Sequence, residues 1–145
     1  MSQNMQNAAK IFNSGGNCCQ SVLTVFAEKY GLDSKLALKL ACGFGSGVRS
    51  GEICGVVSGA AMVIGLKYGN ESLADTTAKA LCSEKTKEFI RIFQEKHTSI
   101  VCRDLLGFDP STREGQAQGK AKTDTVRPCD DLVQSSIHLL EELGY

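Results

Sequence analysis

Residues 53–66 read ICGVVSGAAMVIGL, fourteen residues without a charge between Glu52 and Lys67. This is the longest uncharged apolar stretch in the chain. A helix that crosses a membrane needs about 20 such residues, so we expect no membrane span. The stretch predicts instead a helix from about Glu52 to Leu66 that is buried in the core of a domain.

Helical periodicity also dominates on both sides of this stretch, because apolar residues recur every three or four positions. Few segments alternate in the manner of a strand, and only two prolines occur. No internal repeat divides the chain. The sequence therefore predicts an all-α fold, a single-domain bundle of about six or seven helices over residues 1–145. The other predicted helices lie at about residues 3–13, from Asn17, from Asp33 or Ser34, and at about 71–96, 100–106 and 128–143. Asn17 is a favoured N-cap residue, and Gln20 three residues later completes the pattern of a capping box.

A polar segment interrupts this pattern before the last helix. Residues 109–125 consist mostly of Ser, Thr, Arg, Gln, Gly and Lys, with almost nothing apolar to bury. Such a composition is typical of an exposed loop. We therefore expect residues 109–125 to form a loop on the surface of the helical domain.

The charge balance narrows the classes of partner. The chain has 145 residues, of which 16 are basic and 16 acidic, so its net charge is zero. Binding to nucleic acid or to an anionic membrane usually requires a basic surplus, and neither is expected here. Residues 1–7 are polar, so no signal peptide is expected and a cytoplasmic location is the default.

Seven cysteines are many for a chain of this size that is not secreted. Reducing compartments keep thiols free, so clustered cysteines suggest metal ligation or thiol chemistry. No Cys-x-x-Cys pair occurs, which excludes the local motifs of thioredoxins, zinc ribbons and ferredoxins. The alternative is that these cysteines pack as small buried hydrophobes.

Four of the cysteines fall in the first turn of four different predicted helices. They are Cys18, Cys54, Cys102 and Cys129. Unpaired backbone N–H groups and the positive end of the helix dipole favour an anion at that place. A helix N-terminus accordingly lowers the pKa of a thiol, and the thiolate is the form that ligates metals or attacks disulfides. These four cysteines are the candidate site residues.

The other three cysteines have different settings. Cys42 falls in the last turn of its predicted helix, where the dipole disfavours a thiolate, and Cys82 falls in the middle of a helix. Both are expected to pack in the interior. Cys19 points about 100° away from Cys18 around the helix, and its role stays open.

A glycine-rich stretch from Gly43 to Gly51 leads to Cys54. No strand is predicted before it and no Gly-Lys-Ser/Thr follows, so it does not fit a nucleotide-binding loop. We expect a tight connection that lets two helices and Cys54 approach a common site. Arg49 and Glu52 are expected to form a local ion pair, or Arg49 to offset the negative charge of thiolates at the site.

Several pieces of the sequence together form a known pattern: NCCQSVL (17–23), GFGSG (43–47), RSGEICGVVSGA (49–60), GLKYG (65–69), CRDLLG (102–107) and Cys129. With them the chain resembles the C_GCAxxG_C_C family of small redox-active proteins, from about residue 7 to the C-terminus. The resemblance implies a helical fold and a redox role. It maps the four characteristic cysteines of the family onto Cys18, Cys54, Cys102 and Cys129.

The chain departs from the family pattern at two positions. Val56 stands where the family has Ala two residues after its second cysteine, and Cys19 stands where a small apolar residue is usual. The resemblance therefore implies that Cys19 is not one of the shared ligands.

We expect a redox or electron-transfer protein in which Cys18, Cys54, Cys102 and Cys129 bind an iron–sulfur cluster, since four thiolates are the usual complement. A redox partner protein is implied but not identified, and a homodimer is compatible with this class. Two alternatives remain open. One is a metal-free thiol–disulfide protein that uses pairs of the same cysteines, and the other is a Cys₄ zinc site that stabilises a helical binding module. Whether the protein is an enzyme is not decided.

Overall fold

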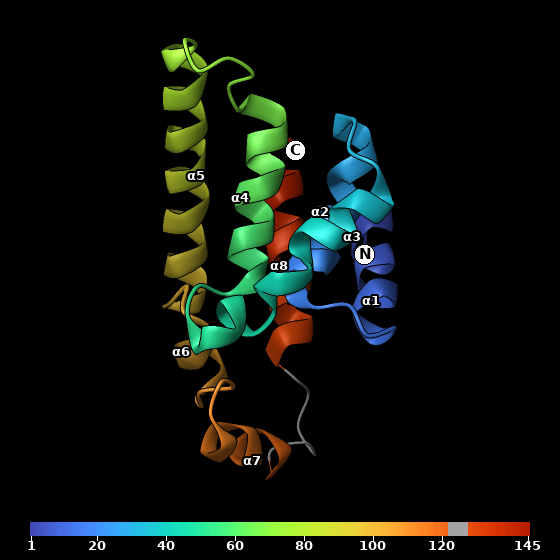
Figure 1. The fold of residues 1–145 in the computed structure, drawn as a ribbon, viewed down its shortest axis with the longest axis vertical. Helices are drawn as coiled ribbons and strands as arrows, with labels where there is room; N and C mark the ends of the chain where they lie inside the picture. Colours follow the sequence, from blue (N-terminus) through green and yellow to red (C-terminus); the bar gives the residue numbers. More distant parts are fainter. Residues whose placement is uncertain (122–127) are drawn as a thin grey trace.

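Helices make up most of the computed structural model, which describes residues 1–121 and 128–145 (Figure 1). Those residues contain eight α-helices where six or seven were expected, and the predicted all-α fold is confirmed. Their only β structure is an isolated bridge between Ile53 and Val101. The helices are α1 (Gln3–Asn13), α2 (Cys18–Ala27), α3 (Ser34–Ala41), α4 (Gly55–Tyr68), α5 (Thr76–His97), α6 (Cys102–Leu106), α7 (Arg113–Ala121) and α8 (Pro128–Glu142).

The central helix of the bundle is α4, with α2, α5 and α8 packed around it (Figure 1). Its apolar composition explains this place, since Val56, Val63 and Ile64 are fully buried. Burial of a valine or isoleucine side chain contributes about 1.5–3 kcal/mol. The predicted core helix is confirmed, although it begins at Gly55 rather than at Glu52.

Two glycines let α2 approach α4 closely. A Cβ added at Gly59 would lie 3.1 Å from both the Cys19 carbonyl oxygen and the Val22 Cβ. A Cβ at Gly55 would lie 3.1 Å from the Cys18 Cβ. The start of α2, which carries Cys18, is therefore held against the start of α4.

Polar side chains cap several of the helices. Asn17 and Gln20 form the predicted capping box, in which each side chain accepts a hydrogen bond from the backbone N–H of the other, at 2.8 and 2.9 Å. Asp33 caps α3 as expected. Asp75 caps α5, which is why this long helix begins at Thr76, later than its apolar pattern suggested.

The prediction of an exposed loop at residues 109–125 is wrong for its central part. Residues Arg113–Ala121 form α7, which lies beyond α6 at the lower end of Figure 1. The Thr112 Oγ1 accepts a hydrogen bond from the Gly115 N–H at 2.9 Å and so stabilises the first turn. Most of α7 is exposed, in keeping with its polar composition. Residues 122–125 lie outside the described part of the chain.

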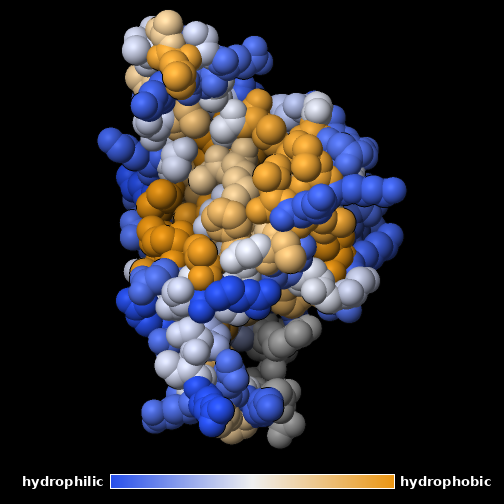
Figure 2. All heavy atoms as spheres, in the orientation of Figure 1, coloured by the Kyte–Doolittle hydropathy of each residue, from blue (hydrophilic) through white to orange (hydrophobic). Residues whose placement is uncertain are grey.

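Apolar side chains gather over α3 and α4 on the face shown in Figure 2. Leu36 and Leu40 of α3 are about half exposed, at 47% and 54%. These exposed leucines are a feature of the surface of the bundle. None of the described helices combines the length and apolarity that are needed to cross a bilayer.

Candidate functional site

A cavity of about 150 Å³ lies at the end of the bundle where α4 begins. Its wall includes all four candidate cysteines, Cys18, Cys54, Cys102 and Cys129. The rest of the wall comes from the glycine-rich segment at residues 45–49 and from apolar side chains of α1, α6 and α8. Four cysteines that are far apart in the sequence thus share one site.

Each of these cysteines stands at the start of a different helix. Cys18 and Cys102 are the first residues of α2 and α6, and Cys129 is the second residue of α8. Cys54 is the N-cap residue immediately before α4, rather than a residue of its first turn as expected. Figure 1 shows the starts of α4 and α8 and the short α6 at the same end of the bundle. The positive ends of these helices therefore favour negative charge in the cavity.

Two crossed backbone hydrogen bonds hold Cys54 and Cys102 beside each other. The Cys54 N–H donates to the Ile100 carbonyl oxygen at 2.8 Å, and the Cys102 N–H donates to the Glu52 carbonyl oxygen at 2.6 Å. These bonds flank the isolated bridge between Ile53 and Val101. They also explain why α4 begins later than predicted, because the backbone of residues 52–54 is extended and paired outside the helix.

The glycine-rich segment forms the tight connection that was expected. Ser46, Gly47, Val48 and Arg49 all adopt left-handed backbone angles, with φ between 53° and 62°. For residues other than glycine this conformation costs about 1–2 kcal/mol each. Gly47 has a further constraint, because an added Cβ would lie 2.9 Å from the Cys102 Cβ. The segment is thus a strained turn pressed against one of the four cysteines.

The expectation that helix starts lower the thiol pKa values is wrong for Cys18, Cys54 and Cys102, because burial and mutual proximity raise them instead. For Cys18, a hydrogen bond with the Cys129 side chain, burial and the charges of the other three cysteines hold the pKa well above its usual range. Burial raises the pKa of Cys54 to about 11, although the backbone N–H groups of Val56 and Val57 partly oppose it by bonding the sulfur. Burial, followed by the charge of Cys54, raises the pKa of Cys102 to about 12.

Cys18, Cys54 and Cys102 are therefore neutral thiols at pH 7 when nothing else is in the cavity. Four thiolates cannot coexist there unless a positively charged group compensates them. Metal ions do this, because they bind the deprotonated thiol and release its proton. The cavity thus favours thiols alone or thiolates with a metal.

The described residues contain no group of three or more His, Cys, Asp or Glu side chains that is placed to hold a metal ion. The four cysteines share a cavity wall without converging on one point. A single ion would need its thiolate ligands at about 2.3 Å from itself.

The expected ion pair between Arg49 and Glu52 does not form. Glu52 pairs instead with Arg103, with 2.6 Å between the Glu52 Oε1 and the Arg103 Nη1. The strained turn directs Arg49 to the cavity wall instead. The contact of Arg103 with Glu52 could not be predicted from the sequence, because the two residues are 51 positions apart and no local pattern links them.

The remaining three cysteines lie outside the cavity wall. Cys19 is fully buried, its Sγ is 3.9 Å from the Met62 Sδ, and burial raises its pKa to about 12. Cys82 is half-buried against the core, as expected. The packing predicted for Cys42 is wrong: its side chain is exposed at the end of α3, while its carbonyl oxygen accepts a hydrogen bond from Asn17.

A family model described as "Putative redox-active protein (C_GCAxxG_C_C)" matches residues 16–143. The chain belongs to the C_GCAxxG_C_C family. The match spans all four cysteines of the cavity and its glycine-rich wall. The description of the C_GCAxxG_C_C family names a redox activity and no particular cofactor. No curated protein and no solved structure matches the chain.

Proposed function

We propose that the protein transfers electrons through an iron–sulfur cluster held by Cys18, Cys54, Cys102 and Cys129. The observation that carries this proposal is that all four cysteines line one cavity. Four cysteine thiolates are the complement that two-iron and four-iron clusters use. The redox description of the family is consistent with that chemistry.

The dimensions of the site favour a cluster over a single zinc ion. A cavity of about 150 Å³ is of the size that admits a group as large as benzene. A cluster bonds its cysteines through different iron atoms, so the thiolates can stand further apart than around one ion. In this protein the four cysteines come from the starts of four different helices and line one wall. No comparable observation supports the zinc alternative.

The chain also supplies groups that stabilise thiolates. The N–H groups of Val56 and Val57 bond the Cys54 sulfur, and such bonds to sulfur tune the reduction potential of a cluster. The starts of α2, α4 and α8 add the positive ends of their dipoles. When bound, the cluster would take up and release one electron at a time.

Substitution of each cysteine after anaerobic reconstitution tests the proposal. We expect Cys18→Ser, Cys54→Ser, Cys102→Ser and Cys129→Ser to retain much less iron and inorganic sulfide than the wild type. Cys42→Ser is the matched control, because the same atom is replaced outside the cavity at an exposed position. Equal iron in all five variants would contradict the proposal.

A second candidate is metal-free thiol–disulfide chemistry by one pair of these cysteines. It is favoured by one contact, the hydrogen bond between the Cys18 and Cys129 side chains. Two neighbouring thiols can form a disulfide if their Cα atoms lie within about 7 Å. Mild oxidation of the metal-free protein followed by peptide mass spectrometry should then link Cys18 to Cys129. Random pairing that includes the exposed Cys42 would argue against it.

A further inference from the structure

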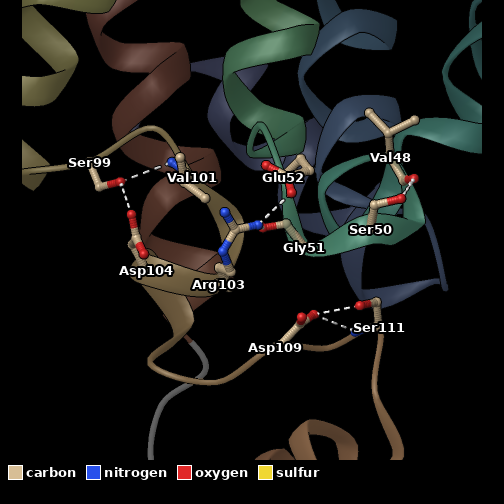
Figure 3. A network of polar contacts seen from close by, with 10 residues as sticks. All are labelled: Val48, Ser50, Gly51, Glu52, Ser99, Val101, Arg103, Asp104, Asp109 and Ser111. Carbon is tan, nitrogen blue, oxygen red and sulfur yellow. Dashed lines mark hydrogen bonds and ion pairs between the residues drawn. The ribbon is translucent and has the colours of Figure 1, made fainter.

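Arg103 bonds two consecutive residues of a distant segment (Figure 3). Its Nη1 donates to the Gly51 carbonyl oxygen at 3.1 Å and to the Glu52 Oε1 at 2.6 Å. Arg103 directly follows Cys102 in the chain, and Gly51 and Glu52 closely precede Cys54. One guanidinium group thus joins the two segments that carry these cysteines.

The bonds of Arg103 extend the crossed backbone pair described above. The Cys102 N–H bonds the Glu52 carbonyl oxygen, while Arg103 bonds the neighbouring Gly51 carbonyl oxygen and the Glu52 side chain. The Cys54 N–H bonds the Ile100 carbonyl oxygen on the other side of the bridge. A slip of one segment along the other would break these bonds together and move both sulfurs.

Neighbouring contacts fix the two ends of this junction. The Ser99 Oγ accepts from the Val101 N–H and donates to Asp104, both at 3.0 Å (Figure 3). The Asp109 carboxylate lies so close to Gly51 that a Cβ on the glycine would meet it at 2.6 Å. Arg103 therefore lies between these two sets of contacts, and its own side chain supplies the hydrogen bonds to Gly51 and Glu52 that join the two segments.

We propose that Arg103 is a positioning residue for the four-cysteine cavity. Its side chain holds Cys54 and Cys102 in the register that lets both thiols line the cavity. The proposal rests on the proposed function only in assuming that these two cysteines act at one site. The pair formed by Arg103 and Glu52 is partly exposed, at 43% and 57%. An exposed ion pair adds little to global stability, so the effect of Arg103 is local to the junction.

Amide hydrogen exchange of the metal-free protein tests this directly. In Arg103→Gln, the Cys54 and Cys102 amides should exchange about fivefold faster than in the wild type. Amides in the middle of α4 should be unchanged. Arg103→Lys should restore much of the protection, because an ammonium group can still donate to both acceptors.

The matched control is Arg91→Gln. Arg91 also forms an exposed pair, with 2.8 Å between its Nη1 and the Glu95 Oε1, but this pair lies within α5. The control should leave exchange at Cys54 and Cys102 as in the wild type. Unchanged exchange at both cysteines in Arg103→Gln, or equal acceleration in Arg91→Gln, would overturn the positioning role.

The reconstituted protein gives a second measurement. Arg103→Gln should alter the visible circular dichroism of the bound cluster and release iron to a chelator about fivefold faster, with Arg91→Gln unchanged. If the wild type binds no iron, the cluster proposal fails, and the exchange experiment still decides the role of Arg103. An identical spectrum and release rate in Arg103→Gln would count against positioning.

Discussion

Gly47→Ala tests the close packing of the strained turn against the cysteines. Gly47 has φ of +62°, and an added Cβ would lie 2.5 Å from the Glu52 N and 2.9 Å from the Cys102 Cβ. The left-handed backbone costs about 1–2 kcal/mol for an alanine, and forcing atoms into a packed site costs about 1–3 kcal/mol more. We expect the unfolding free energy to fall by about 3 kcal/mol in total, with a fall in Tm of about 9 °C.

Two other glycines separate these contributions in the same assay, urea unfolding of the metal-free protein. Gly31 also has a positive φ, +83°, but nothing lies within 4 Å of an added Cβ. Gly31→Ala should therefore lose only the backbone contribution, about 1 kcal/mol. Gly43 has neither constraint, so Gly43→Ala should change stability by about 0.5 kcal/mol or less. If Gly47→Ala is no worse than Gly31→Ala, the turn does not press on Cys102 as described.

Three further predictions follow from single contacts. Asn17→Ala removes the side-chain acceptor of the capping box and two bonds to the end of α3, and should lower the unfolding free energy by about 2 kcal/mol in urea titration. Ser136→Ala leaves the buried Val56 carbonyl oxygen without its side-chain donor and should cost about 1 kcal/mol, whereas no loss would mean that this bond is replaced. Burial raises the pKa of the Cys102 thiol from a usual 9.0 to about 12. The resulting contribution to the stability of the folded state is fully present below pH 9. It is lost as the pH rises from 9 towards 12, because the unfolded chain then loses this proton while the folded chain keeps it. Unfolding free energy should fall over that range in the metal-free wild type and less steeply in Cys102→Ser; equal slopes would contradict the burial of this thiol.

The helices and their caps could be predicted because their signals are local. The apolar stretch at residues 53–66 predicts the central helix, and Asn17 with Gln20 predicts a capping box that forms as expected. The helix starts at Cys18 and Cys129 follow from the same kind of signal. Each prediction depends on residues within about one turn of each other, where side chain and backbone interact directly.

The features that could not be predicted depend on residues far apart in the chain. The start of α4 moves to Gly55 because the preceding backbone pairs with residues 100–102. Glu52 bonds Arg103 rather than Arg49, since the left-handed turn directs Arg49 to the cavity wall. The polar helix α7 has no apolar face to mark it, so its composition resembles that of a loop. Sequence spacing carries none of this information.

The central claim is that the four cysteines of the cavity hold an iron–sulfur cluster. The most direct measurement is the absorption spectrum of the anaerobically purified or reconstituted wild-type protein, together with its iron, inorganic sulfide and zinc content. We expect a broad visible absorption band, with iron and sulfide in equal amounts. A colourless protein that takes up neither after reconstitution would contradict it and leave the thiol pair of Cys18 and Cys129 as the redox group.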